Sequence, residues 1–190
     1  MSAPSLRRVE GRPVSRTSMR SESESPSRFF ALLRVLCERE VEFVVIGGLA
    51  VNLHGYERAT KDVDVVPEQS EDNLGRLWAA LTELEASPKE LIDFRPEEVP
   101  AEFTPRGLID GGGNWVLETR LGRIDVMQWV KGVDSYEELR AGAVREEMPE
   151  IGYPIWIAGL DDLITMKQEA GRDLDLIDIT ALRMAHGLEE

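Results

Sequence analysis

The spacing of apolar residues changes several times along the chain, and the first clear pattern lies between residues 29 and 37. Apolar side chains recur there at helical intervals, which predicts an amphipathic helix that begins near Pro26-Ser27. Its apolar positions are Phe29, Leu32, Leu33, Leu36 and Cys37. Because no nearby group would stabilise a thiolate, we interpret Cys37 as a packing residue and not as a nucleophile.

Between residues 43 and 84 the pattern predicts two strands and two helices. A β-rich run over 43–46 ends at Gly47-Gly48, and a short helix over 49–54 opens directly from these glycines and ends at Gly55. A strand over 60–66 and a helix over 74–84 follow. For His54, at the end of the short helix, packing or capping is favoured over metal binding, because it lacks ligand partners.

The second half of the chain opens with a segment, 86–114, that is rich in Pro and Gly and is predicted to be mostly loop. Two strands over 115–117 and 123–129 follow, with a turn at Leu121-Gly122, and then a helix over 136–141 and a strand over 153–157. Two helices, 160–170 and 173–186, end the pattern. This order predicts an α+β fold with a mixed β-sheet flanked by helices and with C-terminal helices, and not a doubly wound fold.

Composition divides the chain into two parts. Residues 1–27 are rich in Ser, Arg and Glu with few large apolar residues, so we expect a disordered basic tail, or a start codon placed too far upstream. Residues 28–190 have the size and apolar content of one domain.

Charge and cysteine usage limit the classes of function. The net charge is −14, although residues 1–28 hold six Arg against three Glu, so the body of the chain is acidic. This argues against broad nonspecific nucleic-acid binding. A single cysteine, the lack of a long apolar run and the lack of a signal-like segment lead us to expect a cytoplasmic protein without membrane contact.

The segment 61–66, Lys-Asp-Val-Asp-Val-Val, carries the clearest chemical signal. In a strand, Asp62 and Asp64 would share one face while Val63 and Val65 point to the core. Two neighbouring carboxylates repel each other, and a divalent cation such as Mg²⁺ removes that conflict. The pattern therefore predicts half of a metal site for phosphoryl chemistry, although an exposed edge strand would explain it as well.

The context of this strand favours a site. Gly47 and Gly48 let a ligand approach the backbone, and the helix after them offers free N–H groups to an anion; a tight turn without a ligand is the alternative. Asp125 supplies a third carboxylate between the apolar residues Ile124 and Val126. Such a carboxylate is costly unless it is paired or bound to metal, or unless it lies on an exposed face where Arg123 pairs with it.

These residues resemble the signature of the DNA polymerase β-like nucleotidyltransferase superfamily, and most of all the small bacterial AbiEii-type proteins of type IV toxin–antitoxin systems. The resemblance rests on Gly47-Gly48-Leu-Ala-Val and on Arg58-x-Thr-Lys61-Asp62-x-Asp64. It implies that Asp125 takes the place of the third acidic residue, and it covers about residues 40–180, with gaps between 67 and 120.

The C-terminal part extends the resemblance. Relatives of this kind carry a helical Lys and then Arg-x-Lys-Asp-x-x-Asp followed by an apolar residue, and this chain gives Lys167, Arg172, Asp175 and Asp178. Leu174 stands where the family usually has Lys. The same helix also has an apolar stripe at Leu174, Ile177, Ala181 and Met184, which predicts the core-facing side, with Asp175 and Asp178 either on a solvated face or in a site.

The leading hypothesis is an enzyme that moves a nucleoside monophosphate from a nucleoside triphosphate (NTP, for example ATP) to an acceptor hydroxyl. By resemblance, Mg²⁺ or Mn²⁺ would be held by Asp62, Asp64 and Asp125, with Lys167 completing the catalytic set. The nucleotide would contact Gly47, Gly48, Arg58, Lys61, Arg172 and Asp175. The acceptor is open: a tRNA end, a protein hydroxyl or a small molecule. A cognate toxin or antitoxin protein is a possible partner, and the alternative is a catalytically weak nucleotide-binding or antitoxin-like regulatory module of the same fold.

Overall fold

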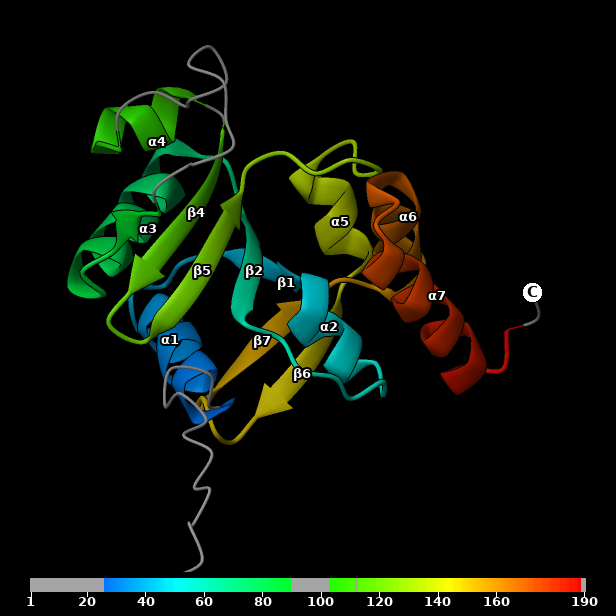
Figure 1. Cartoon of the computed structure of the whole chain (residues 1–190). Coiled ribbons are helices and arrows are strands. Elements are labelled where there is room, and N and C mark those ends of the chain that lie inside the picture. Colours follow the sequence, from blue (N-terminus) through cyan, green and yellow to red (C-terminus); the bar gives the residue numbers. More distant parts are fainter. Residues whose placement is uncertain (1–25, 90–102, 112, 189–190) are drawn as a thin grey trace, which may run out of the picture.

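A mixed β-sheet forms the centre of the protein, for which a computed structural model describes residues 26–89, 103–111 and 113–188 (Figure 1). Within these residues the sheet has seven strands in the order β3-β4-β5-β2-β1-β7-β6. The strands are β1 (Phe43–Ile46), β2 (Asp62–Pro67), β3 (Ser87–Pro88), β4 (Asn114–Thr119), β5 (Gly122–Met127), β6 (Val144–Met148) and β7 (Tyr153–Ile157). Parallel pairs (β2 with β5, β1 with β7) and antiparallel pairs occur together, so the predicted α+β fold with a mixed sheet is confirmed.

Helices cover both faces of the sheet and enclose two apolar cores (Figure 1). The helices are α1 (Pro26–Glu38), α2 (Gly47–Leu53), α3 (Glu71–Glu83), α4 (Pro105–Gly111), α5 (Tyr136–Gly142), α6 (Leu160–Ala170) and α7 (Asp173–Ala185). The larger core packs α1, α3 and α4 against one face, and the second core packs α2, α5, α6 and α7 against the other. None of the helices in the described part of the chain is long and apolar enough to cross a membrane.

Strand alternation places the acidic residues on one face. Val63 and Val65 are fully buried in the larger core, whereas Asp62 and Asp64 lie on the opposite face of β2, as the alternation predicts. Because β2 and β5 are parallel with Asp64 paired to Asp125, the third carboxylate lies on that same face. The site is therefore on the side of the sheet that α2, α6 and α7 cover.

Three elements differ from the sequence prediction. The segment 86–114 was expected to be mostly loop, but Ser87–Pro88 forms the short strand β3 and Pro105–Gly111 forms α4, with Thr104 accepting a hydrogen bond from the Gly107 N–H at 3.0 Å. Pro at the first helical position needs no N–H partner, so a proline that looked like a breaker starts a helix here. Strand β6, at the sheet edge, was missed because its three central residues are charged, so that the segment shows no apolar alternation. Residues 90–102 and 112 lie outside the described part.

The orientation of α7 is the reverse of the predicted one. Leu174, Ile177 and Met184 were expected to face the core, yet they are 49%, 54% and 77% exposed. Asp175 and Asp178 are instead buried, beside Ile179 and Leu182 on the inner side. The physical reason is that buried cations from other elements pair with these two carboxylates, as the site geometry below shows.

Candidate active site

A cavity of about 660 Å³ opens on the face of the sheet that carries the carboxylates. Its volume falls within the range typical of small-molecule sites. Residues from β2, β5, the start of α2, α6 and α7 line it. All ten residues proposed from the sequence are among them: Gly47, Gly48, Arg58, Lys61, Asp62, Asp64, Asp125, Lys167, Arg172 and Asp175.

Asp64 is the carboxylate with the most strongly perturbed environment. It lies beside Asp125 in the parallel β2–β5 register and accepts a hydrogen bond from the Gly48 backbone N–H. Burial, followed by the charges of Asp62 and Asp125, raises the pKa of Asp64 to about 7. The carboxylate is therefore held in a position where its own ionisation is unfavourable.

Asp125 is the second carboxylate of the site with a raised pKa. Burial and then the charge of Asp62 raise its pKa to about 6, and its buried Oδ1 atom has no hydrogen-bond partner. The neighbouring Arg123, which sequence reasoning considered as its partner, donates from Nε to Glu118 at 2.9 Å instead. A bound cation would relieve a buried carboxylate oxygen that has no hydrogen-bond partner and belongs to a residue beside another carboxylate.

The donor chemistry of this group fits a hard divalent cation such as Mg²⁺, which takes oxygen ligands. Within the described residues, however, no group of three or more His, Cys, Asp or Glu side chains is arranged so that it could hold a metal ion by itself. Mg²⁺ commonly binds through one or two carboxylates together with substrate phosphates. The arrangement of Asp62, Asp64 and Asp125 suits that shared mode, with part of the ligand set left to a nucleotide.

The Gly47-Gly48 turn joins β1 to α2 directly against these carboxylates. Gly47 has φ +63°, and a side chain there would collide with the Asp64 carboxyl group. A Cβ on Gly48 would lie 2.6 Å from Thr60 Oγ1 and 3.1 Å from an Arg58 guanidinium nitrogen. Both positions therefore need glycine, because neighbouring side chains lie too close to leave room for a Cβ. The turn brings the N-terminus of α2 to the cavity wall.

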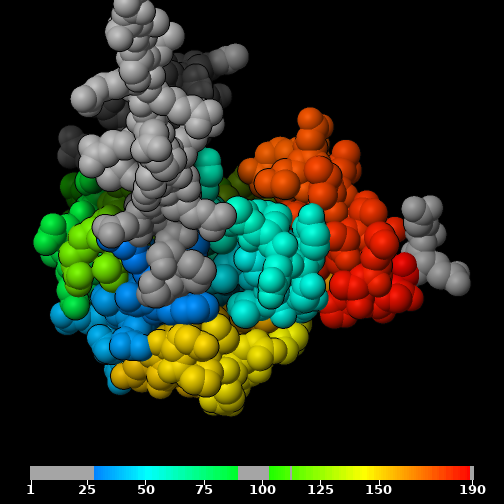
Figure 2. All heavy atoms as spheres, turned by 60° about the horizontal axis from the view of Figure 1, so that its bottom comes forward, coloured from blue at the N-terminus to red at the C-terminus, as the bar shows by residue number. Residues whose placement is uncertain are grey.

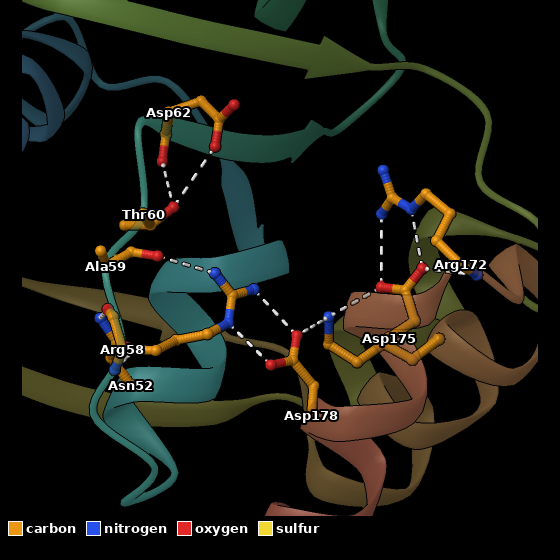
Figure 3. Close-up of polar contacts among 9 residues, drawn as sticks. Asn52, Arg58, Ala59, Thr60, Asp62, Arg172, Asp175 and Asp178 are labelled. Atoms are coloured by element: carbon orange, nitrogen blue, oxygen red, sulfur yellow. Dashed lines mark hydrogen bonds and ion pairs between the residues drawn. The ribbon is translucent and has the colours of Figure 1, made fainter.

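A buried ion-pair network connects the loop before β2 with the two C-terminal helices (Figure 3). Arg58 donates from Nε and a terminal nitrogen to the two oxygens of Asp178, at 2.7 and 2.8 Å. Lys167 Nζ lies 2.6 Å from the same carboxylate and 3.2 Å from Asp175. Figure 2 shows the corresponding contact of α2 and its following loop, in cyan, with α6 and α7, in orange to red. Arg58 and Lys167 are thus engaged by carboxylates, and Asp178 was not among the proposed site residues.

Arg172 ends this network at the mouth of the cavity. Its Nε donates to Asp175 at 2.7 Å while its side chain remains 77% exposed. The hydrogen bonds from Arg172 and Lys167 lower the pKa of Asp175 although burial acts in the opposite direction. Asp175 also accepts a hydrogen bond from the backbone N–H of Arg172, which is the N-cap residue of α7.

Several cavity residues were not singled out from the sequence. Thr60 donates to the Asp62 carboxylate at 3.3 Å, and Asn114, Trp129 and Lys131 lie along the wall that β4, β5 and the following segment form. The short Thr60–Asp62 spacing could have suggested the first contact. The others come from a segment whose sequence carries no motif.

The two side chains that were assigned structural roles have structural contacts. His54 Nε2 lies 2.8 Å from the Ala158 carbonyl oxygen, and its ring contacts that of His186. Burial raises the pKa of the Cys37 thiol to about 11. Both findings agree with packing roles and give neither residue a part in the cavity.

Comparison with known proteins shows the same fold in antibiotic-modifying nucleotidyltransferases. No protein-family model and no curated protein sequence matches this chain. The solution structure of the antibiotic-resistance factor ANT(2'')-Ia has a TM-score of 0.53 at 16% identity, with 84% of this chain and 82% of that chain covered. The lincomycin-bound lincosamide antibiotic adenylyltransferase LnuA has a TM-score of 0.50 at 13% identity, with 85% and 98% covered. The chain therefore has a nucleotidyltransferase-like fold.

Proposed function

We propose that this protein is a metal-dependent nucleotidyltransferase that moves a nucleoside monophosphate from an NTP to an acceptor hydroxyl. The observation that carries the proposal is the pair of carboxylates Asp64 and Asp125, which lie side by side on two parallel strands. Both have a raised pKa, so their charged forms are unfavourable without a cation. Both line a cavity beside the Gly47-Gly48 turn. The fold shared with nucleotidyltransferases supports it.

In the proposed reaction, the acceptor oxygen attacks the α-phosphorus, a new P–O bond forms, and the bond to the bridging oxygen breaks so that pyrophosphate leaves with the electron pair. Asp62, Asp64 and Asp125 would hold Mg²⁺ or Mn²⁺, which supplies charge neutralisation at the phosphates and polarises the reacting oxygen atoms. Asp125 would lie beside the reacting oxygen and could also accept the acceptor proton.

The cationic side chains around the cavity would have three different roles. Lys61 and Arg172 have exposed side chains at the cavity and would contact phosphate oxygens directly. Lys167 is buried and paired, so it would act through its electrostatic field, which lowers the pKa of Asp64. Arg58 would hold the loop before β2 in place through Asp178.

The acceptor that merits the first test is a small molecule with a free hydroxyl. The compared structures include ANT(2'')-Ia in complex with adenylyl-2''-tobramycin and LnuA with lincomycin, which supports this class for the present chain. A tRNA end or a protein hydroxyl, with an AbiEii-type toxin–antitoxin partner, is the next set to test.

A second candidate function is a nucleotide-binding regulatory module with little catalysis. The observation in its favour is that Lys167, the cation expected to neutralise phosphate, is only 5% exposed and is paired with two carboxylates. Such a module would bind nucleotide in a metal-dependent way without releasing pyrophosphate.

Calorimetric titration of ATP, GTP, CTP and UTP, each with Mg²⁺ and each with chelator, tests the proposal. We expect at least one nucleotide to bind only with metal. Asp64→Asn should abolish either this metal-dependent binding or the transfer reaction. The control Asp110→Asn, at an exposed carboxylate, should affect neither. Pyrophosphate release in the presence of an acceptor separates the enzyme from the regulatory module. If no nucleotide binds in a metal-dependent way, both functions are excluded.

A further inference from the structure

Trp129 is the most exposed of the four tryptophans and lies at the edge of the cavity. Its relative exposure is 60%, whereas Trp115 is buried at 5% and Trp78 and Trp156 are half-buried in contacts with other elements. A large aromatic side chain left in water gives up the apolar burial that normally stabilises it. Its position along the cavity wall offers a reason for that exposure.

The backbone of Trp129 is fixed on both sides by one side chain. Asn114 Nδ2 donates to the Trp129 carbonyl oxygen at 2.9 Å, and the Trp129 N–H donates to Asn114 Oδ1 at 3.1 Å. Asn114 is the first residue of β4, which pairs with β5 along its full length. The backbone that carries the exposed ring is thus anchored to the neighbouring strand at the edge of the cavity.

The distance from the carboxylates suits the far end of a nucleotide. Trp129 follows Asp125 by four residues, and the chain bends at Gln128 between them, so their Cα atoms lie no more than about 13 Å apart. A separation within this limit is compatible with a nucleotide whose phosphates lie at the carboxylates and whose base extends toward Trp129. The buried side chains of Leu163 and Met166 also line the cavity and give it an apolar part, and exposed Lys131 lies two residues after Trp129 in the chain.

We propose that Trp129 is the surface on which the base of the bound nucleoside triphosphate stacks. The inference rests on the proposed function. The acceptor hydroxyl must reach the α-phosphate beside Asp125, so its contacts are expected close to the carboxylates, whereas the base is the part of the nucleotide that extends away from the reacting atoms. Stacking on an aromatic ring accepts any base, because every base has a π-face.

The test compares ATP with inorganic tripolyphosphate, which has no base, as Mg²⁺-dependent ligands of the full-length protein. We expect Trp129→Leu to weaken ATP binding about 5- to 150-fold, the range that base–aromatic stacking supplies. Tripolyphosphate binding should not change. Trp129→Phe keeps an aromatic face and should retain most of the ATP affinity, and Tyr153→Leu, at another exposed aromatic residue on β7, is the matched control.

A spectroscopic readout supports the same comparison, because ATP should quench the tryptophan fluorescence of the wild-type protein and not that of Trp129→Phe. Equal ATP affinity in the wild type and Trp129→Leu would overturn the inference. An equal loss for ATP and tripolyphosphate would also overturn it, since Trp129 would then support the phosphate site. If the wild type binds neither ligand, the proposed function itself fails.

Discussion

Replacement of Asp64 by Asn removes a charge whose formation burial and two neighbouring carboxylates oppose. The pKa of Asp64 is about 7, against an ordinary value of 3.8, because of burial and the charges of Asp62 and Asp125. Asn resembles the protonated carboxyl group in size and can still accept the hydrogen bond from the Gly48 N–H. The change therefore isolates the electrostatic cost of ionisation.

The magnitude follows from the pKa difference. Well below pH 4 the carboxyl group is protonated in both the folded and the unfolded chain, so it contributes no pH dependence. Between pH 4 and 7 only the unfolded chain releases the proton, so the free energy of unfolding falls as pH rises and then levels off. A pKa about three pH units above normal corresponds to about 4 kcal/mol, an upper limit because Asn also loses hydration when buried.

Urea unfolding of the wild type and Asp64→Asn at pH 5 and pH 8, both with chelator, measures this effect. We expect the gain in the free energy of unfolding to reach up to about 4 kcal/mol at pH 8 and to be about one third as large at pH 5, where only part of the cost has developed. Exposed Asp110→Asn is the control and should show no such pH dependence. A loss of stability at pH 8, or an equal gain at both pH values, would refute the assigned cause of the pKa shift.

Three other experiments test the buried ion pairs, the Gly47-Gly48 turn and the environment of Cys37. Asp178→Ala removes the carboxylate that Arg58 and Lys167 share. It should lower the free energy of unfolding, measured with urea, by about 3–5 kcal/mol. A change below about 1 kcal/mol would mean that the two cations find other partners or water. Gly48→Ala should lower the melting temperature, because the new Cβ would meet Thr60 Oγ1. The control Gly75→Ala, in open space within α3, should raise the melting temperature through about 1 kcal/mol of helix propensity. Equal changes in melting temperature for the two variants would contradict the close approach at the turn. The Cys37 thiol, with a pKa of about 11, should react with a disulfide reagent at pH 8 far more slowly in the native protein than after unfolding, and rapid native labelling would exclude the buried environment.

Sequence alone determined the elements whose signal is local. The alternation of Asp62, Val63, Asp64 and Val65 predicted which side chains share a face, and the two glycines at the end of β1 predicted the turn into α2. These inferences hold because strand alternation and a glycine at positive φ depend on neighbouring residues only. Motif spacing in turn named ten residues that all line one cavity.

Only the tertiary structure decided the orientation of α7. Its apolar stripe at Leu174, Ile177 and Met184 predicted the inner face, but periodicity counts apolar burial and cannot register a cation supplied by another element. Asp178 faces inward because Arg58, 120 residues earlier in the chain, and Lys167 on α6 form ion pairs with it. A long-range ion pair of this kind leaves no periodic trace in the sequence.

The same limit applies to the chemistry of the site. The sequence supplied the three carboxylates, but the register of β2 against β5 is what brings Asp64 beside Asp125, and the Arg123–Glu118 pair is what leaves Asp125 Oδ1 without a partner. Trp129 carried no motif and gained its place at the cavity only through Asn114 on the neighbouring strand. Residue type and spacing set the available chemistry, whereas strand pairing sets the distances that give a carboxylate its pKa and an exposed ring its place at a binding site.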